Sequence, residues 1–229
     1  MELLGQSAKP SALSDWAYET IKEAILNLRV APGAQLHVES LAEQMSTSRT
    51  PVREALLRLE GDGLVRTVPR IGFFVTEITR RDLQEVLELR ELLESYATRN
   101  AVPLLTDEDL ARIDQLFETA VTAVEEGKLD LYLEMDTAFH SLLIERADNS
   151  RMIATMESLR NLIRRERALS VRSPENVHET IAEHQRIMEA LHRRDGESAG
   201  RLMGEHLRAV ARRLLRLVDL NRENATSIA

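Results

Sequence analysis

Four side chains in the second half of this 229-residue chain have the types and spacing of metal ligands. Asp136 and His140 are four residues apart, so on a helix they lie on one face. His184 and His206 each occupy the apolar stripe of a later helical segment. Three imidazoles and a carboxylate suit zinc first, with nickel, manganese or iron as alternatives, and they need no thiolate. Taken singly, each histidine can equally be an ordinary core residue, and this interpretation stays open.

Arg90 is the further candidate for ligand binding in this half. It lies on the apolar stripe of its segment, so it is expected to point inward. A divalent ion with one aspartate leaves a buried charge of +1, which favours an anion, and a guanidinium matches a small organic acid. The alternative is a structural pair with Glu94, four residues later. The sequence does not choose between the two.

A second set of candidates lies in residues 45–72, which hold five basic and three acidic residues although the whole chain has a formal net charge of −8. Arg49 and Arg53 are four residues apart and share a face with the Thr50 hydroxyl. An arginine there can bind guanine in the major groove of DNA. Arg66 and Arg70 would meet phosphate or the minor groove, with Gly72 allowing a close backbone approach.

The elements that must position these arginines are short. Apolar spacing predicts helices over 16–28, 38–45 and 50–60, with Ser48 or Thr50 as the N-cap of the third. The β-branched and aromatic runs 64–68 and 73–76 flank a turn and predict a hairpin. This order is a winged helix-turn-helix over residues 13–78, after a loose tail at 1–12.

The elements that must position the metal ligands are long helices. From residue 79 the chain has helical periodicity and no convincing strand. The predicted fold is therefore mostly α, with a C-terminal bundle of about six helices over 79–222 and a tail at 223–229. The predicted helices are 79–101, 106–127, 129–147, 150–171, 175–194 and 196–222.

Composition limits the class of protein. There are no cysteines, which excludes disulfides and thiolate metal sites and fits a cytoplasmic protein. No apolar run is long enough for a bilayer, and the N-terminus lacks the pattern of a secretion signal. We therefore expect no membrane partner.

The string SRTPVREALLRLEGDGLV resembles the recognition-helix signature of the GntR family of bacterial transcription regulators, and LAEQMST and VRTVPRIGFFV around it resemble the same family's winged domain. The resemblance implies that Arg49, Thr50 and Arg53 read bases and phosphates, with Arg70 and Gly72 at the wing tip. One departure is Ile71, which stands where a small residue is common.

The helical half resembles the FCD effector domain of one GntR subfamily. ELRELLESYA at 88–97, the D-x-x-x-H pattern, EHQRIMEAL and GEHL carry this resemblance. It implies that Asp136, His140, His184 and His206 bind a divalent metal inside the bundle, that the bundle forms a homodimer, and that six helices give the shorter of two FCD layouts.

The function predicted from these features is a regulator that binds a pseudo-palindromic DNA operator and responds to a small organic acid held beside the metal, with Arg90 as its further contact. We predict no enzymatic activity. One alternative is a regulator that senses the metal itself. The other is a metal-dependent hydrolase fused to a DNA-binding head, although no base-plus-nucleophile arrangement accompanies the ligands.

Overall fold

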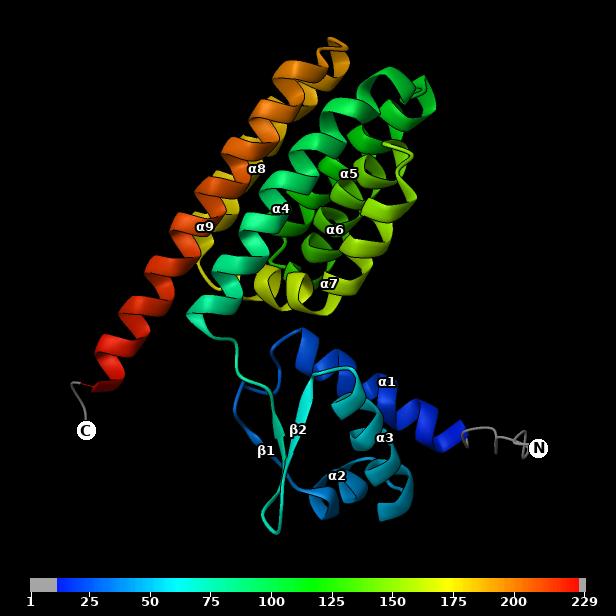
Figure 1. The fold of residues 1–229 in the computed structure, drawn as a ribbon, viewed down its shortest axis with the longest axis vertical. Coiled ribbons are helices and arrows are strands. Elements are labelled where there is room, and N and C mark those ends of the chain that lie inside the picture. The colour runs from blue at the N-terminus through cyan, green and yellow to red at the C-terminus, as the bar shows by residue number, and fades with distance from the viewer. Residues whose placement is uncertain (1–11, 227–229) are drawn as a thin grey trace. The chain divides into compact units, whose positions relative to one another are not determined.

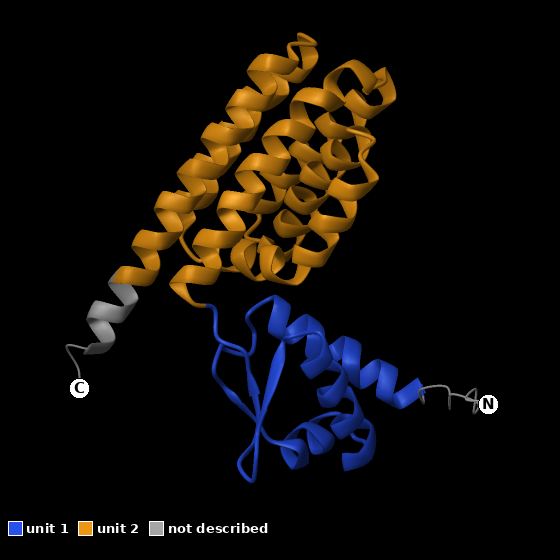
Figure 2. Ribbon diagram, viewed as in Figure 1, with its two compact units in different colours: residues 1–78 blue, residues 79–229 orange. Residues whose placement is uncertain are grey.

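A computed structural model describes the backbone of residues 12–226 and the side chains through residue 219. The chain forms two compact units, residues 1–78 and 79–229 (Figure 2). The tail predicted at 1–12 lies almost wholly outside the described residues. The last helix runs to Thr226, so of the tail predicted at 223–229 only 227–229 lie outside them.

The first unit is a winged helix-turn-helix, as predicted (Figure 1). Its two hairpin strands pair antiparallel, with Arg66 opposite Phe74. A third strand, β1, was not predicted; it has two residues, too few to give an alternation signal, and exists because it pairs with β3. The elements are α1 (Ala12–Leu26), β1 (Gln35–Leu36), α2 (Val38–Gln44), α3 (Arg49–Gly61), β2 (Val65–Val68) and β3 (Gly72–Val75).

The core of this unit is built on α1 and α3. The apolar positions of α3 are fully buried, as their spacing predicts, and they pack with Ile21 and Ile25 of α1. Ser48 is the N-cap of α3, which leaves Arg49 and Thr50 in its first turn. Burial of one face thus fixes which residues α3 presents to solvent. The buried α3 positions are Val52, Ala55, Leu56 and Leu59.

The second unit is a bundle of six α-helices, which confirms the predicted fold class (Figure 1). Thr79 and Thr106 begin their helices with capping boxes, in which each threonine and the aspartate three residues later exchange hydrogen bonds. The helices are α4 (Arg80–Ala101), α5 (Asp107–Glu125), α6 (Leu129–Arg146), α7 (Ser150–Ser170), α8 (Pro174–His192) and α9 (Gly196–Thr226), with a 3-10 turn at Val102–Leu104 after α4. Among the described helices, none is both long and apolar enough for a bilayer crossing.

Glycines bring α4 and α9 into close contact along the bundle. A Cβ added at Gly196 or Gly200 would lie 2.8 Å from a backbone oxygen of α4, that of Arg99 or Ser95 respectively. Any side chain at these positions would push the helices apart. The close approach matters for the site, because α4 carries Arg90 and α9 carries His206.

Candidate functional site

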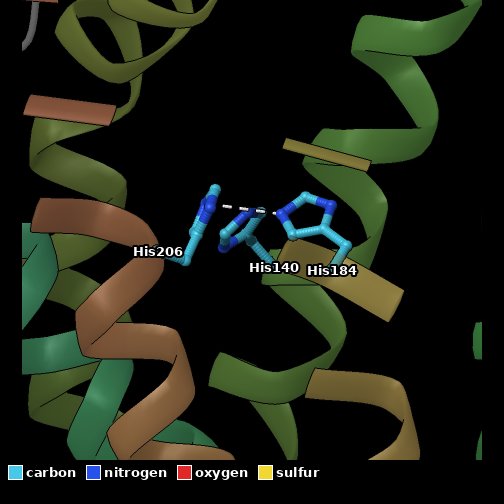
Figure 3. A group of neighbouring side chains, drawn as sticks. All are labelled: His140, His184 and His206. Atoms are coloured by element: carbon cyan, nitrogen blue, oxygen red, sulfur yellow. Dashed lines mark hydrogen bonds between the residues drawn. The ribbon is translucent and has the colours of Figure 1, made fainter. Parts of the chain in front are cut away.

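Three of the predicted metal ligands, His140, His184 and His206, meet inside the bundle. They come from α6, α8 and α9, and one ligand nitrogen of each lies within 4.8 Å of those of the other two (Figure 3). His184 Nε2 and His206 Nε2 are 3.3 Å apart. All three side chains are buried. Three helices, of which α8 and α9 are consecutive in the chain, therefore direct their imidazoles to one point.

Two carboxylates, one buried and one partly buried, orient two of these rings. Glu94 of α4 lies 2.5 Å from His140 Nδ1, and Glu183 of α8 lies 2.7 Å from His206 Nδ1. Ionised carboxylates only accept hydrogen bonds, so each Nδ1 donates its hydrogen and Nε2 is the nitrogen left to bind a metal. Outer carboxylates of this kind fix the tautomer of metal-binding histidines.

Asp136, the fourth predicted ligand, lies beside the cluster but outside hydrogen-bond distance of it. Its Oδ1 is 4.0 Å from His140 Nε2 and 3.8 Å from His184 Nδ1. Its Oδ2 is 3.2 Å from Arg167 Nε. The carboxylate is buried and faces the imidazoles, so it is placed to add an anionic donor to the three imidazole nitrogens.

The protonation states suit a cation. Burial lowers the pKa of His140 to about 4, although Glu94 acts in the opposite direction. Burial and the neighbouring His206 hold the pKa of His184 well below its usual range. Burial alone would raise the pKa of Asp136, but the Arg167 guanidinium lowers it below its ordinary value. Neutral imidazoles and an ionised carboxylate are the forms in which these side chains bind metals.

The chemistry of the donors and the spacing of one pair fit a divalent ion. Two nitrogens that each lie about 2.0–2.1 Å from one ion are separated by roughly 3.0–3.4 Å. The 3.3 Å between His184 and His206 falls in this range. The chemistry of the donors, nitrogen with one carboxylate oxygen, is that of zinc and its neighbours in the first transition row.

Arg90 points inward, as predicted, and there it forms the pair with Glu94 that the sequence left open. Its Nε donates to Glu94 Oε1 at 2.7 Å, and its Nη1 donates to Glu166 of α7. The two carboxylates hold its pKa above the ordinary arginine value against the effect of burial. Arg90 also lines a cavity beside the histidines, of about 20 Å³, together with Asp136, Glu166 and Arg167.

Several residues of this network were missed. Arg165, Glu166 and Arg167, consecutive residues of α7 that the sequence did not single out, are all buried. The Arg213 side chain is 14% exposed and donates to both oxygens of Glu183. Consecutive charges give no periodic signal, so nothing in the sequence marked these residues as buried.

Glu183 acts on a histidine of a neighbouring helix and not on the histidine beside it in the sequence. It precedes His184, and adjacent side chains on a helix point about 100° apart. It therefore cannot act on His184, but it reaches His206 on the next helix. Burial alone would raise the pKa of Glu183, yet hydrogen bonds from His206 and Arg213 lower it to about 2.

The predicted DNA contacts on α3 lie at the surface of the first unit. Arg49, Thr50 and Arg53 are exposed, in the first two turns of the helix. The Arg49 side chain is 73% exposed, with a loose ion pair of 3.2 Å to Glu39. Arg53 lies over the Phe73 ring with 5.8 Å between its Cζ and the ring centroid. These side chains are free to meet a ligand without any change in the core.

The wing carries the other predicted contacts. Arg66 stacks over Phe74 at 4.9 Å and Arg70 is exposed at the turn, with a φ of +67°. Gly72 has a φ of +134°, which a side chain would strain. Ile71, the departure from the family pattern, is 62% exposed.

Comparison with known proteins identifies both units. The profile of the family described as bacterial regulatory proteins, gntR family, matches residues 13–75, and that of the FCD domain matches residues 85–209. The HTH-type transcriptional repressor RspR of Escherichia coli K12 is 29% identical over 85% of each chain. An HTH-type transcriptional regulator of Streptomyces ambofaciens is 32% identical over 84% of this chain and 81% of the other.

A solved structure agrees with these matches. E. coli McbR/YncC has a TM-score of 0.74 and 27% identity, covering 90% of this chain and 99% of the other. The matched families are transcription regulators and not enzymes, so the hydrolase alternative is set aside. The chain belongs to the GntR family of bacterial transcription regulators, with an N-terminal helix-turn-helix DNA-binding domain and a C-terminal FCD domain.

Proposed function

We propose that this regulator binds a divalent metal ion at His140, His184, His206 and Asp136, and responds to a small organic acid bound beside it. The observation that carries the proposal is the convergence of three buried imidazoles, two of them oriented by carboxylates through Nδ1. When bound, the metal supplies a positive charge that attracts an anion. The four ligand side chains would hold the metal, and the buried residues around them line the cavity.

Elemental analysis of the purified protein tests the metal. We expect about one divalent ion per chain, retained in the wild type and lost in His184→Ala and His206→Ala. His178→Ala is the matched control, because His178 is an exposed histidine near the start of α8. Wild-type protein with no bound metal and unchanged thermal stability in chelator would leave the three histidines as core residues.

The proposed response runs through α4. This helix carries Arg90 and Glu94, and it begins at Arg80, five residues after the end of strand β3 of the DNA-binding unit. A ligand that binds one arrangement of α4 better than another shifts the population of the whole chain. We propose Arg90 as the residue that links the cavity to this helix, since it lines the cavity and bonds to Glu94 and Glu166.

For DNA we propose that Arg49, Thr50 and Arg53 read bases and phosphates of a pseudo-palindromic operator, and that Arg66, Arg70 and Gly72 approach the backbone or minor groove. Their exposure supports this proposal. A cytoplasmic location follows from a function on DNA.

We further propose a homodimer in which α4 meets the same helix of a second copy. Leu89, Leu92 and Tyr96 form an apolar stripe on α4 and are 40%, 68% and 48% exposed. Such a stripe is unusual on a monomer. Each chain carries one recognition helix, whereas a palindromic operator has two half-sites. A second copy of the chain is therefore needed to occupy both half-sites. Light scattering after size exclusion should give a dimer, dissociated by Leu92→Glu and not by Leu104→Glu, which changes another exposed leucine. A monomeric wild type would overturn this assignment.

The small volume of the cavity favours a second candidate, a regulator that senses the metal itself. Metal that survives dialysis against chelator would argue against it, whereas loss of metal together with a change in operator binding would favour it.

A further inference from the structure

Glu94 joins α4 to the histidine cluster, although α4 carries none of the four proposed metal ligands. Its Oε2 lies 2.5 Å from His140 Nδ1, and its Oε1 accepts from Arg90 Nε at 2.7 Å. All three side chains are 2% exposed. Burial alone would raise the pKa of Glu94, but Arg90 and His140 hold it well below its usual range. The carboxylate is therefore ionised, and both of its hydrogen bonds are charge-assisted.

Glu183 holds His206 in the same way but connects a different pair of helices. It accepts from His206 Nδ1 at 2.7 Å and from the Arg213 guanidinium at 2.7 and 3.0 Å. Glu183 lies on α8, whereas His206 and Arg213 lie on α9, and each of these helices already carries a proposed ligand. Glu183 therefore connects two ligand-bearing helices, whereas Glu94 connects a ligand to a helix that has none.

The helix that carries Glu94 is also the one that leads to the DNA-binding unit. It begins at Arg80, five residues after strand β3 ends. When His140 serves as a ligand, its ring is held at Nε2 and at Nδ1 together, and Glu94 is held with it. Without a metal, the ring is held at Nδ1 alone. The two states of the site therefore restrain α4 to different degrees, which is the difference that a conformational response requires.

We infer that Glu94 is a positioning residue that couples occupancy of the metal site to α4, and that Glu183 contributes to metal affinity without this second effect. The inference rests on the proposed metal site and adds the route by which occupancy of that site acts on the helix. It applies equally to a metal that is a resident cofactor and to a metal that is the sensed signal.

Hydrogen exchange of the full-length protein, measured with and without zinc, tests this route. Amides that exchange faster than global unfolding allows report the local opening of each helix. In α4, zinc should slow these amides about tenfold more than in α5, a typical magnitude for coupling between sites. Helix α5 is the internal reference, because it carries neither a proposed ligand nor a described hydrogen bond to one. Equal slowing in α4 and α5 would reflect overall stabilisation of the bundle and would overturn the inference.

Substitution by glutamine tests each carboxylate in turn. A glutamine amide has one acceptor oxygen, so when that oxygen faces the arginine, its NH₂ group faces the histidine Nδ1. Nδ1 must then accept, which places the ring hydrogen on Nε2, the nitrogen left to bind a metal. Glu94→Gln and Glu183→Gln should therefore each weaken zinc binding by about 10–100-fold, measured by competition with a chromophoric chelator.

The matched control for affinity is Glu85→Gln. Glu85 also lies on α4 and pairs with an arginine four residues earlier, but its side chain is 56% exposed. This variant should bind zinc as tightly as the wild type and keep the zinc-dependent slowing of exchange in α4. A loss of zinc affinity equal to that of Glu94→Gln would show that any charge removed from α4 weakens the site, and would overturn the role given to Glu94.

At zinc concentrations that saturate each variant, the two glutamine substitutions should differ. Glu183→Gln should keep the zinc-dependent slowing in α4. Glu94→Gln should lose it, while the ligand-bearing helices α6, α8 and α9 keep theirs. Loss in both variants would make the slowing a property of the metal site as a whole, and retention in both would remove Glu94 from the route. Either result overturns the inference.

Zinc binding separates this inference from the function on which it rests. A wild type that binds no zinc overturns the proposed metal site and the inference together. A wild type that binds zinc with equal slowing in α4 and α5 overturns the inference alone. If Glu94→Gln fails to fold, which circular dichroism reports, the comparison of α4 with α5 in the wild type still decides the result.

Discussion

The two units use arginine in opposite ways. In the winged-helix unit, Arg49 and Arg53 stand on the solvent face of α3, and a cluster of apolar side chains forms the core beneath them. In the helical unit, Arg90 and Arg167 are buried and bind the carboxylates that surround the histidines. The proposed DNA contacts of the first unit can therefore be replaced without disturbing its core. In the second, the residues that would bind the ligand also hold the bundle together.

The largest expected effect is on the stability of the helical unit. Arg90→Leu leaves Glu94 and Glu166 as buried carboxylates without their partner, so we expect a loss of roughly 3–5 kcal/mol in the free energy of unfolding. Arg81→Leu is the control: it lies on the same helix and also pairs with a glutamate four residues later, but its side chain is 85% exposed. Urea denaturation measures both. If both variants have the same free energy of unfolding, the buried Arg90 contributes no more to folding than the exposed Arg81 does.

The second effect is a pH dependence of stability in the protein kept metal-free by chelator. The pKa of His140 is about 4 in the folded chain and about 6.5 when unfolded, so between these values the unfolded state binds more protons. Stability should be unaffected by His140 above pH 6.5 and fall by about 3 kcal/mol as the pH drops to 4.

His140→Gln provides the reference for that measurement, because its side chain cannot be protonated in this range. The difference in unfolding free energy between wild type and variant should shrink as the pH falls from 6.5 to 4. A difference that stays constant would show that His140 is not held neutral by burial.

The third effect is on operator affinity. Arg49→Ala and Arg53→Ala should each weaken specific binding by about 1–3 kcal/mol if the guanidiniums contact bases. Their melting temperatures should stay close to that of the wild type, since both side chains are exposed. Binding is measured by fluorescence anisotropy with operator and scrambled DNA. Unchanged affinity in both variants would remove α3 from the DNA interface.

The smallest effect is at the wing. Arg70→Ala should weaken binding to operator and scrambled DNA about equally, and should reduce the slope of log affinity against log salt by about 1, the signature of one lost phosphate contact. Anisotropy titrations at several salt concentrations measure the slope. A loss confined to the operator would instead make Arg70 a reader of sequence.

Much of the fold could be predicted because its signals are local. Apolar spacing located all nine helices that the structure describes, apart from a few residues at their ends. The third strand was not predicted, because β1 has only two residues and depends on β3 for its hydrogen bonds. Strand pairing is a property of two segments, and a segment of this length carries too little pattern of its own.

The sequence by itself determined which side chains point inward on each helix, because the period of 3.6 residues assigns faces without reference to neighbours. This is why Asp136, the three histidines and Arg90 were identified as candidates. Only the tertiary structure decided which faces meet. Glu183 orients His206 from another helix, and Glu166 and Arg167 become buried at the cavity wall because α7 packs there. Hydrogen bonds and desolvation between helices depend on contacts across the bundle, and no spacing along one chain segment encodes them.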